Sequence, residues 1–170
     1  PTPKVAGSAE TMIVTGLTPG HTYFFAVRAQ DEVPNLGGLS NSLSAVASSD
    51  TIAPIAITNL VAVSGVQEGE VNLSWTASGD NGSTGTATTY QIRYSASAIT
   101  NETAWTNATP ILAGIPTPRI SGSAESMTVS GLTSATTYYF AVRALDEVPN
   151  SGGISNSPSA VAALDTSAPA

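Results

Sequence analysis

Two segments of this 170-residue chain repeat each other. Residues 1–54 align without a gap to residues 116–169, and 37 of the 54 aligned positions are identical. Shared composition does not produce an ungapped match of that length, so the two segments are copies of one unit. The offset between them, 115 residues, is the size of a domain rather than of a solenoid repeat. We therefore expect one and a half copies of a single domain.

Short runs of alternating apolar and polar residues fill the whole copy. Runs of this kind at residues 71–75, 90–94 and 138–144 predict strands with one buried face. Tyr139 and Arg143 fall on the outward side of the last run. Clusters of Gly, Asn, Asp, Ser and Pro separate the runs, and no segment shows a sustained helical period. About seven short strands in a domain of this size predict an antiparallel β-sandwich.

The strand residues also resemble the fibronectin type III pattern. The resemblance rests on Trp75, on Tyr90-x-Ile92-x-Tyr94 and on Leu17-x-Pro19-x-x-x-Tyr23-x-Phe25-x-Val27-x-Ala29, with Leu132, Tyr138, Phe140, Val142 and Ala144 in the second copy. The stretches GDNGSTGTATTYQIRYS and RALDEVPNSGGISN are similar to a subgroup that is frequent in secreted bacterial proteins. The resemblance implies an all-β, immunoglobulin-like sandwich with strands A, B and E in one sheet and C′, C, F and G in the other. It also implies a tyrosine corner at Tyr23 and Tyr138, in which the hydroxyl group bonds to nearby backbone.

The repeat and the resemblance together set the expected domain boundaries. Residues 1–50 are expected to be the second half of one domain, with strands E, F and G. A linker at 51–54 leads to a complete domain at 55–165, and 166–170 begin a linker to a further module. The short linkers contain proline, which limits bending, so the tandem repeat is predicted to form a semi-rigid rod.

Composition excludes several classes of function. The net charge is −7 and only five residues are basic, so a clustered basic surface for nucleic acid is not available. No apolar run is long enough for membrane insertion. The chain has no cysteine, which excludes disulfides and thiolate sites. The composition and the resemblance favour an extracellular or cell-surface location.

Acidic and amide side chains are expected to gather at one pole of the sandwich. In this fold the B–C loop, the F–G loop and the preceding linker meet there. The candidate ligands are Asp50, Asp80, Asn81, Asp146, Glu147 and Asn150. Oxygen side chains converging from three segments suit Ca²⁺, which takes six to eight oxygen ligands. Structural calcium is therefore one hypothesis for a cofactor; the alternative is no cofactor, with these residues shaping turns.

Catalysis is not expected. The single histidine, His21, is replaced by Thr136 in the second copy. No serine has a histidine and a carboxylate around it that the repeat preserves. We therefore expect a chain that is not an enzyme.

Three aromatic residues are candidates for stacking on sugar rings, because they fall on outward positions of the F and C′ strands: Phe24, Trp105 and Tyr139. The alternative is that these rings cover the sheet. Four Asn-x-Ser/Thr sequons, at Asn72, Asn81, Asn101 and Asn107, are candidate glycosylation sites in a host with the required machinery.

The leading functional hypothesis is a non-catalytic structural module in an extracellular stalk, adhesin or filament. Near-identical copies favour this, since a spacer tolerates duplication. The alternative is an accessory spacer or weak glycan-binding module of a secreted polysaccharide-degrading enzyme. Expected partners are adjacent modules of the same chain, neighbouring copies of the array or surface glycans. A specific protein-recognition module is disfavoured, because the F–G loops QDEVPNLGG and LDEVPNSGG hardly differ.

Overall fold

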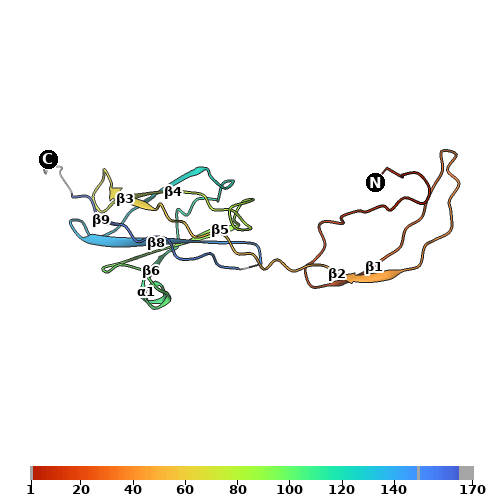
Figure 1. Cartoon of the computed structure of the whole chain (residues 1–170). Coiled ribbons are helices and arrows are strands. Elements are labelled where there is room, and N and C mark those ends of the chain that lie inside the picture. Colours follow the sequence, from red (N-terminus) through yellow and green to blue (C-terminus); the bar gives the residue numbers. More distant parts are fainter. Residues whose placement is uncertain (1, 149, 165–170) are drawn as a thin grey trace. The chain divides into compact units, whose positions relative to one another are not determined.

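The computed structural model describes residues 2–148 and 150–164. The chain divides into two compact units, Pro1–Asp50 (the N-terminal unit) and Thr51–Ala170 (the C-terminal unit) (Figure 1). The predicted linker at 166–170 lies outside the described residues. No helix within the described ranges has the length and apolar character needed to cross a membrane.

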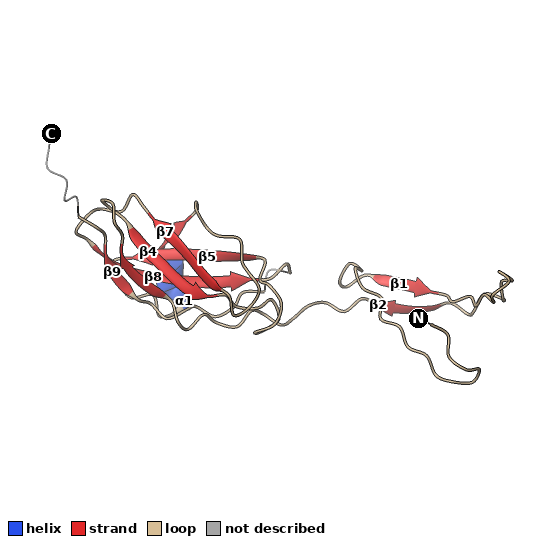
Figure 2. Ribbon diagram, turned by 90° about the horizontal axis from the view of Figure 1, so that it is seen from above, coloured by secondary structure: helices blue, strands red, loops and turns tan. Residues whose placement is uncertain are grey.

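The C-terminal unit contains two antiparallel sheets facing each other (Figure 2). The first sheet has the strand order β3 (Val61–Ser64), β4 (Val71–Thr76), β7 (Ala124–Val129). The second has the order β6 (Thr109–Ile111), β5 (Thr89–Ser95), β8 (Thr137–Leu145), β9 (Ser159–Val161). This arrangement is the predicted sandwich, with β3, β4 and β7 as strands A, B and E and the others as C′, C, F and G. The predicted fold class is confirmed.

The core lies between the two sheets and is formed by the alternating residues of their strands. Its largest fully buried side chains are Leu60, Val71, Leu73, Tyr90, Ile92, Phe140 and Val142, together with Ile99 in a separate cluster. The burial pattern of β4 alternates as the sequence predicts, with Val71, Leu73 and Trp75 buried. Apolar burial of this kind provides the main driving force for folding, so the alternation fixes which face of each strand points inward.

A short helix covers the outer face of the second sheet, and the sequence analysis did not predict it. This helix, α1 (Glu102–Asn107), follows β5. It begins at Asn101, whose side-chain oxygen accepts a hydrogen bond from the Ala104 amide at 2.9 Å. Six residues are too few to show a helical period, and the stretch was expected to belong to the C′ region. The sequence did carry one signal for the start of this helix, the capping residue Asn101 followed by the acidic Glu102 in the first turn.

The N-terminal unit contains one two-stranded antiparallel sheet, β1 (Thr22–Phe25) and β2 (Leu43–Val46). Its register pairs Thr22 with Val46, which is the register of β8 and β9 shifted by 115 residues, where Thr137 pairs with Val161. The predicted strand E is not formed in this unit: its residues 9–14 have no strand structure. In the C-terminal unit strand E (β7) pairs only with β4, and residues 2–50 supply no counterpart of β4.

The tyrosine corner is formed in one copy and not in the other. The Tyr23 hydroxyl accepts a hydrogen bond from the Thr18 amide at 3.0 Å. At Tyr138 the equivalent bond to Thr133 is not formed among the described residues. The Tyr138 ring instead packs edge-on against Tyr94 of β5, with centroids 5.4 Å apart. The prediction was therefore right for Tyr23 and wrong for Tyr138, where a neighbouring ring on β5 holds the side chain.

Candidate functional site

Three backbone segments meet at the loop pole of the C-terminal unit. The Ile55 amide donates to the Gly82 carbonyl at 3.0 Å, and the Gly82 amide donates to the Ala53 carbonyl at 3.1 Å. A Cβ at Gly152 would lie 2.7 Å from the Pro54 carbonyl oxygen, closer than real Cβ atoms approach backbone. The chain before β3 therefore lies against both the B–C loop and the F–G loop, and glycine is required where the F–G loop touches it.

Asp146 shapes the F–G loop. Its side chain is buried and accepts hydrogen bonds from the amides of Val148 and Asn150 at 3.0 and 2.8 Å. Its second oxygen accepts from the Asn150 side-chain amide at 2.7 Å. This is turn formation by an aspartate, the alternative to calcium that the sequence left open.

The same bonding pattern occurs in the N-terminal unit. Asp31 accepts from the amides of Val33 and Asn35 at 3.1 and 2.9 Å, and from the Asn35 side chain at 2.9 Å. The Asn35 side chain and backbone amide hold the pKa of the Asp31 carboxyl below its usual value. The bonding of the aspartate to the asparagine four positions later is thus self-contained and forms in both copies.

Two other acidic candidates, Asp80 and Glu147, are brought together within the C-terminal unit. Carboxylate oxygens of Asp80 and Glu147 lie within 4.8 Å of each other, and the Asn81 side chain donates to Asp80 at 3.1 Å. Asp50 belongs to the N-terminal unit. Two neighbouring carboxylates repel each other, and a cation beside Asp80 and Glu147 would offset that repulsion. Calcium binding at this pole stays a prediction.

A buried carboxylate lies below this pole, and the sequence analysis missed it. Glu125 points inward from β7, where it accepts from the Arg119 amide at 2.7 Å and lies 3.5 Å from the Tyr90 hydroxyl. Burial, with a smaller contribution from the Glu125 charge, raises the pKa of Tyr90 to about 12. The repeat could have revealed this glutamate, because Glu10 stands at the same position in the first copy. Glu10 makes the equivalent contact, accepting a hydrogen bond from the Lys4 amide at 2.7 Å.

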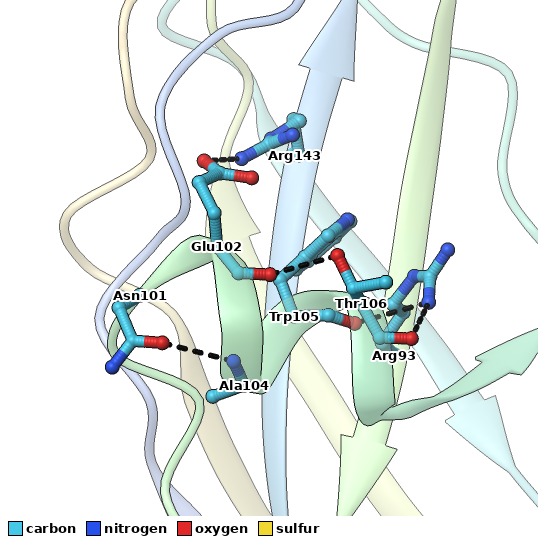
Figure 3. A network of polar contacts seen from close by, with 7 residues as sticks. All are labelled: Arg93, Asn101, Glu102, Ala104, Trp105, Thr106 and Arg143. Atoms are coloured by element: carbon cyan, nitrogen blue, oxygen red, sulfur yellow. Dashed lines mark hydrogen bonds and ion pairs between the residues drawn. The ribbon is translucent and has the colours of Figure 1, made fainter.

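Trp105 lies between two arginines on the outer face of the second sheet (Figure 3). The guanidinium carbons of Arg93 and Arg143 are 5.2 and 4.8 Å from its ring centroid. Arg143 also pairs with Glu102. Arg93 donates to three carbonyls at the end of the helix, those of Trp105, Thr106 and Ala108, at 3.0 to 3.2 Å. The two arginines, which point outward from β5 and β8, therefore fasten α1 to the sheet.

The structure corrects one of the three sugar-stacking candidates. Trp105 is 4% exposed and sits on α1 rather than on a C′ strand, so its ring offers no free face to a sugar. Tyr139 on β8 is half-buried. Phe24 on β1 is exposed, in the N-terminal unit. A row of exposed rings, the usual platform for a polysaccharide chain, is not formed by these three residues.

The four sequon asparagines lie in different local structures. Asn72 on β4 accepts from the Thr128 hydroxyl at 2.7 Å, and Asn81 lies in the B–C loop. Asn101 caps α1 and Asn107 ends it. Asn101 and Asn107 are exposed, and modification of any of the four stays a prediction. His21 is also exposed, in the turn before β1.

Comparison with known proteins agrees with this architecture. Residues 55–160 match the family model of the fibronectin type III domain. Chitinase A1 of Niallia circulans is 34% identical over 171 residues, which cover 98% of this chain and 21% of the chitinase. Endoglucanase B of Cellulomonas fimi is 33% identical over 86% of this chain, and exoglucanase B of the same organism is 32% identical over 91%. Each glucanase is matched over 12% of its own length. This chain therefore spans about a fifth or less of these curated relatives.

Solved structures are similar at lower identity. The FN1–FN3 domains of chicken CNTN1 are 21% identical to this chain, with a TM-score of 0.47, over 87% of this chain and 43% of theirs. The family match covers more than half of the chain, including every strand of the sandwich except the last residue of β9. This chain belongs to the fibronectin type III domain family.

Proposed function

We propose that this chain is a non-catalytic accessory module of a secreted polysaccharide-degrading enzyme, in which it acts as a spacer. The observation that carries the proposal is the match to chitinase A1, which extends over 98% of this chain but only 21% of the chitinase. Two glucanases match in the same way. The sequence analysis held this function as the alternative, and the relatives favour it over the free-standing structural array.

The surface of the sandwich favours a spacer over a glycan binder. Flat polysaccharide binding needs exposed aromatic faces, and Trp105 is instead enclosed by Arg93 and Arg143. The other sugar-stacking candidate on this sheet, Tyr139, is half-buried. At the loop pole, the Asp146 side chain is engaged in forming a turn.

Two assays on the purified chain test this reading. The chain is incubated with insoluble chitin and, separately, with an insoluble glucan, and the protein left in solution after sedimentation and the sugar ends released are both measured. The proposal predicts no depletion and no release. Saturable depletion that Tyr139→Ala abolishes would make the module a glycan binder, and release of sugar ends would make it a catalyst.

The structural array remains a second candidate, favoured by the identity of 37 out of 54 positions between the two copies. It predicts that the chain associates laterally or end to end into filaments. Light scattering across a concentration series, followed by electron microscopy, checks this. A chain that stays monomeric throughout supports the spacer instead.

A further inference from the structure

The B–C loop of the C-terminal unit contains an asparagine followed directly by a glycine, Asn81 and Gly82. This is the only Asn-Gly pair in the sequence. Gly82 has a φ of 63°, a left-handed conformation that other residues rarely adopt. Asn81 and Thr84 exchange two backbone hydrogen bonds across the turn, both at 3.1 Å. The turn therefore requires a glycine directly after the asparagine.

An asparagine before a glycine can lose ammonia, because glycine has no side chain to hinder attack by its nitrogen. Hydroxide takes the proton of the Gly82 amide, and the nitrogen attacks the side-chain carbonyl carbon of Asn81. The new C–N bond closes a five-membered succinimide ring, and the Asn81 side-chain nitrogen leaves as ammonia with a proton from water, which regenerates the hydroxide. Water then opens the ring at either carbonyl and leaves aspartate or isoaspartate. The reaction therefore needs only hydroxide and water.

Both reacting groups are held by hydrogen bonds in the folded chain. The Gly82 amide, whose proton must leave, donates to the Ala53 carbonyl at 3.1 Å. The Gly82 carbonyl accepts from the Ile55 amide at 3.0 Å. The Asn81 side-chain amide, which is the leaving group, donates to the Asp80 carboxylate at 3.1 Å. Ring closure therefore requires that these bonds open first.

The segment that covers Gly82 is itself enclosed. We call residues 53–55 the entry segment. Its central residue, Pro54, is buried, and a Cβ at Gly152 of the F–G loop would lie 2.7 Å from the Pro54 carbonyl oxygen. The F–G loop therefore leaves the entry segment no room to move toward it, which keeps the Ala53 carbonyl on the Gly82 amide.

We propose that Asn81 is a deamidation site that the entry segment protects, and that deamidation in turn releases the entry segment. The succinimide nitrogen has no hydrogen, so the bond to Ala53 is lost when the ring forms. Ring opening to isoaspartate adds a methylene group to the backbone before Gly82. Either product also places a new carboxylate beside Asp80, whose own carboxylate lies within 4.8 Å of that of Glu147, and like charges repel. This inference does not depend on the proposed enzymatic context.

The first test compares the full chain with a synthetic peptide of residues 77–86, in which Asn81 has no tertiary contacts. Both are incubated in the same mildly alkaline buffer, and the conversion of Asn81 to aspartate and isoaspartate is followed by peptide mapping with mass spectrometry. We expect the conversion to be at least about tenfold slower in the chain than in the peptide, since the folded chain reacts only after local opening.

Gly152→Ala and Ser151→Ala form a matched pair of variants in the F–G loop. The added methyl group of Gly152→Ala displaces Pro54, so this variant should deamidate at least about fivefold faster than the unmodified chain. Ser151 is exposed, and Ser151→Ala should leave the rate unchanged. The fluorescence of Trp75 and Trp105, both in the C-terminal unit, checks that each variant is folded.

The second test needs no variant. The deamidated chain, which carries one additional negative charge, is separated from the unmodified chain by anion exchange. Hydrogen exchange at the amides of Ile55 and Gly82 is then measured in both forms. We expect exchange at least about tenfold faster in the deamidated form, because both amides lose their carbonyl partners when the entry segment is released.

Three results would overturn the proposal. One is equal deamidation rates in the chain and the peptide, which would show that the entry segment protects nothing. Another is a folded Gly152→Ala variant that reacts no faster than Ser151→Ala, which would assign the protection to the turn of residues 81–84 alone. The third is unchanged exchange at Ile55 and Gly82 after deamidation, which would show that the entry segment stays in place.

Discussion

Arg143 lies over the ring of Trp105, with its guanidinium carbon 4.8 Å from the ring centroid. The contact joins β8 to α1, and Arg93 lies against the same ring at 5.2 Å. Arg143 also pairs with Glu102, but the Glu102 side chain is 72% exposed whereas that of Arg143 is 11% exposed. Solvent weakens an ion pair with one exposed partner, so the enclosed ring, and not the ion pair, should hold α1 on the sheet.

Replacing the ring should therefore be far more damaging than removing the ion pair. Trp105→Ala leaves a cavity beside Ile99, Ala108 and Ala141 and should lower the free energy of unfolding by about 3–5 kcal/mol. Glu102→Gln should lower it by less than about 1 kcal/mol. Urea unfolding followed by circular dichroism measures both. Equal losses from the two substitutions would show that the ion pair fastens the helix as strongly as the ring does, and would contradict this account.

The buried hydroxyl of Tyr90 predicts a loss of stability at high pH. Burial raises its pKa to about 12 in the folded chain, whereas the unfolded value is about 10. The folded state therefore holds the Tyr90 proton more tightly than the unfolded state does. Below pH 10 the protonated hydroxyl makes its full contribution to the free energy of unfolding. As the pH rises from about 10 to 12, the free energy of unfolding should fall by about 2–3 kcal/mol. Unfolding of the wild type and of Tyr90→Phe is compared across this range. A decline of the same size in Tyr90→Phe would assign the effect to other groups.

Ala135 holds a backbone conformation that disfavours a side chain. Its φ is 57°, and the equivalent residue in the first copy is Gly20, with φ 73°. A left-handed alanine costs about 1–2 kcal/mol, partly offset by the lower backbone entropy of an unfolded alanine. Ala135→Gly should therefore raise the free energy of unfolding by about 0.5–1 kcal/mol. Ala96→Gly, at an exposed turn position without a positive φ, is the control and should lower it slightly. A destabilising Ala135→Gly would contradict the argument.

Asp146 should stabilise the F–G loop with or without metal. Asp146→Ala removes the acceptor for two amides and one side chain, and should lower the free energy of unfolding by about 2 kcal/mol. Thermal melts are recorded in EDTA and in about 1 mM Ca²⁺, the affinity range of extracellular calcium modules. Both tryptophans, Trp75 and Trp105, lie in the C-terminal unit, so their fluorescence reports on it. A loss that appears only with Ca²⁺ would support a calcium site at the pole.

The strands of the sandwich were predictable because the apolar side of each alternating run is buried against the facing sheet. β4, β5 and β8 formed where apolar residues alternate, and Phe140, Val142 and Ala144 point inward as expected. The same reasoning failed for strand E of the N-terminal unit. There the pattern of Met12 and Val14 has no strand to pair with in residues 2–50, so alternation alone did not make a strand.

The candidate site was less predictable, because its features depend on contacts between distant residues. The role of Trp105 is set by Arg93, 12 positions earlier, and by Arg143, 38 positions later, and no local pattern links the three. The inward position of Glu125 breaks the rule that alternating inward residues are apolar. Its recurrence as Glu10 was visible in the repeat, but its hydrogen bonds were not.

The central claim, a spacer within a polysaccharide-degrading enzyme, is tested most directly by inserting residues 1–170 between the catalytic and the substrate-binding domains of a chitinase. A flexible Gly/Ser linker with the same number of residues is the control, and the rates on insoluble chitin and on a soluble chitin oligosaccharide are compared. The account predicts that the insert changes only the rate on insoluble chitin, raising it above the flexible control. Equal rates on both substrates for insert and linker, or a change on the soluble substrate, would contradict it.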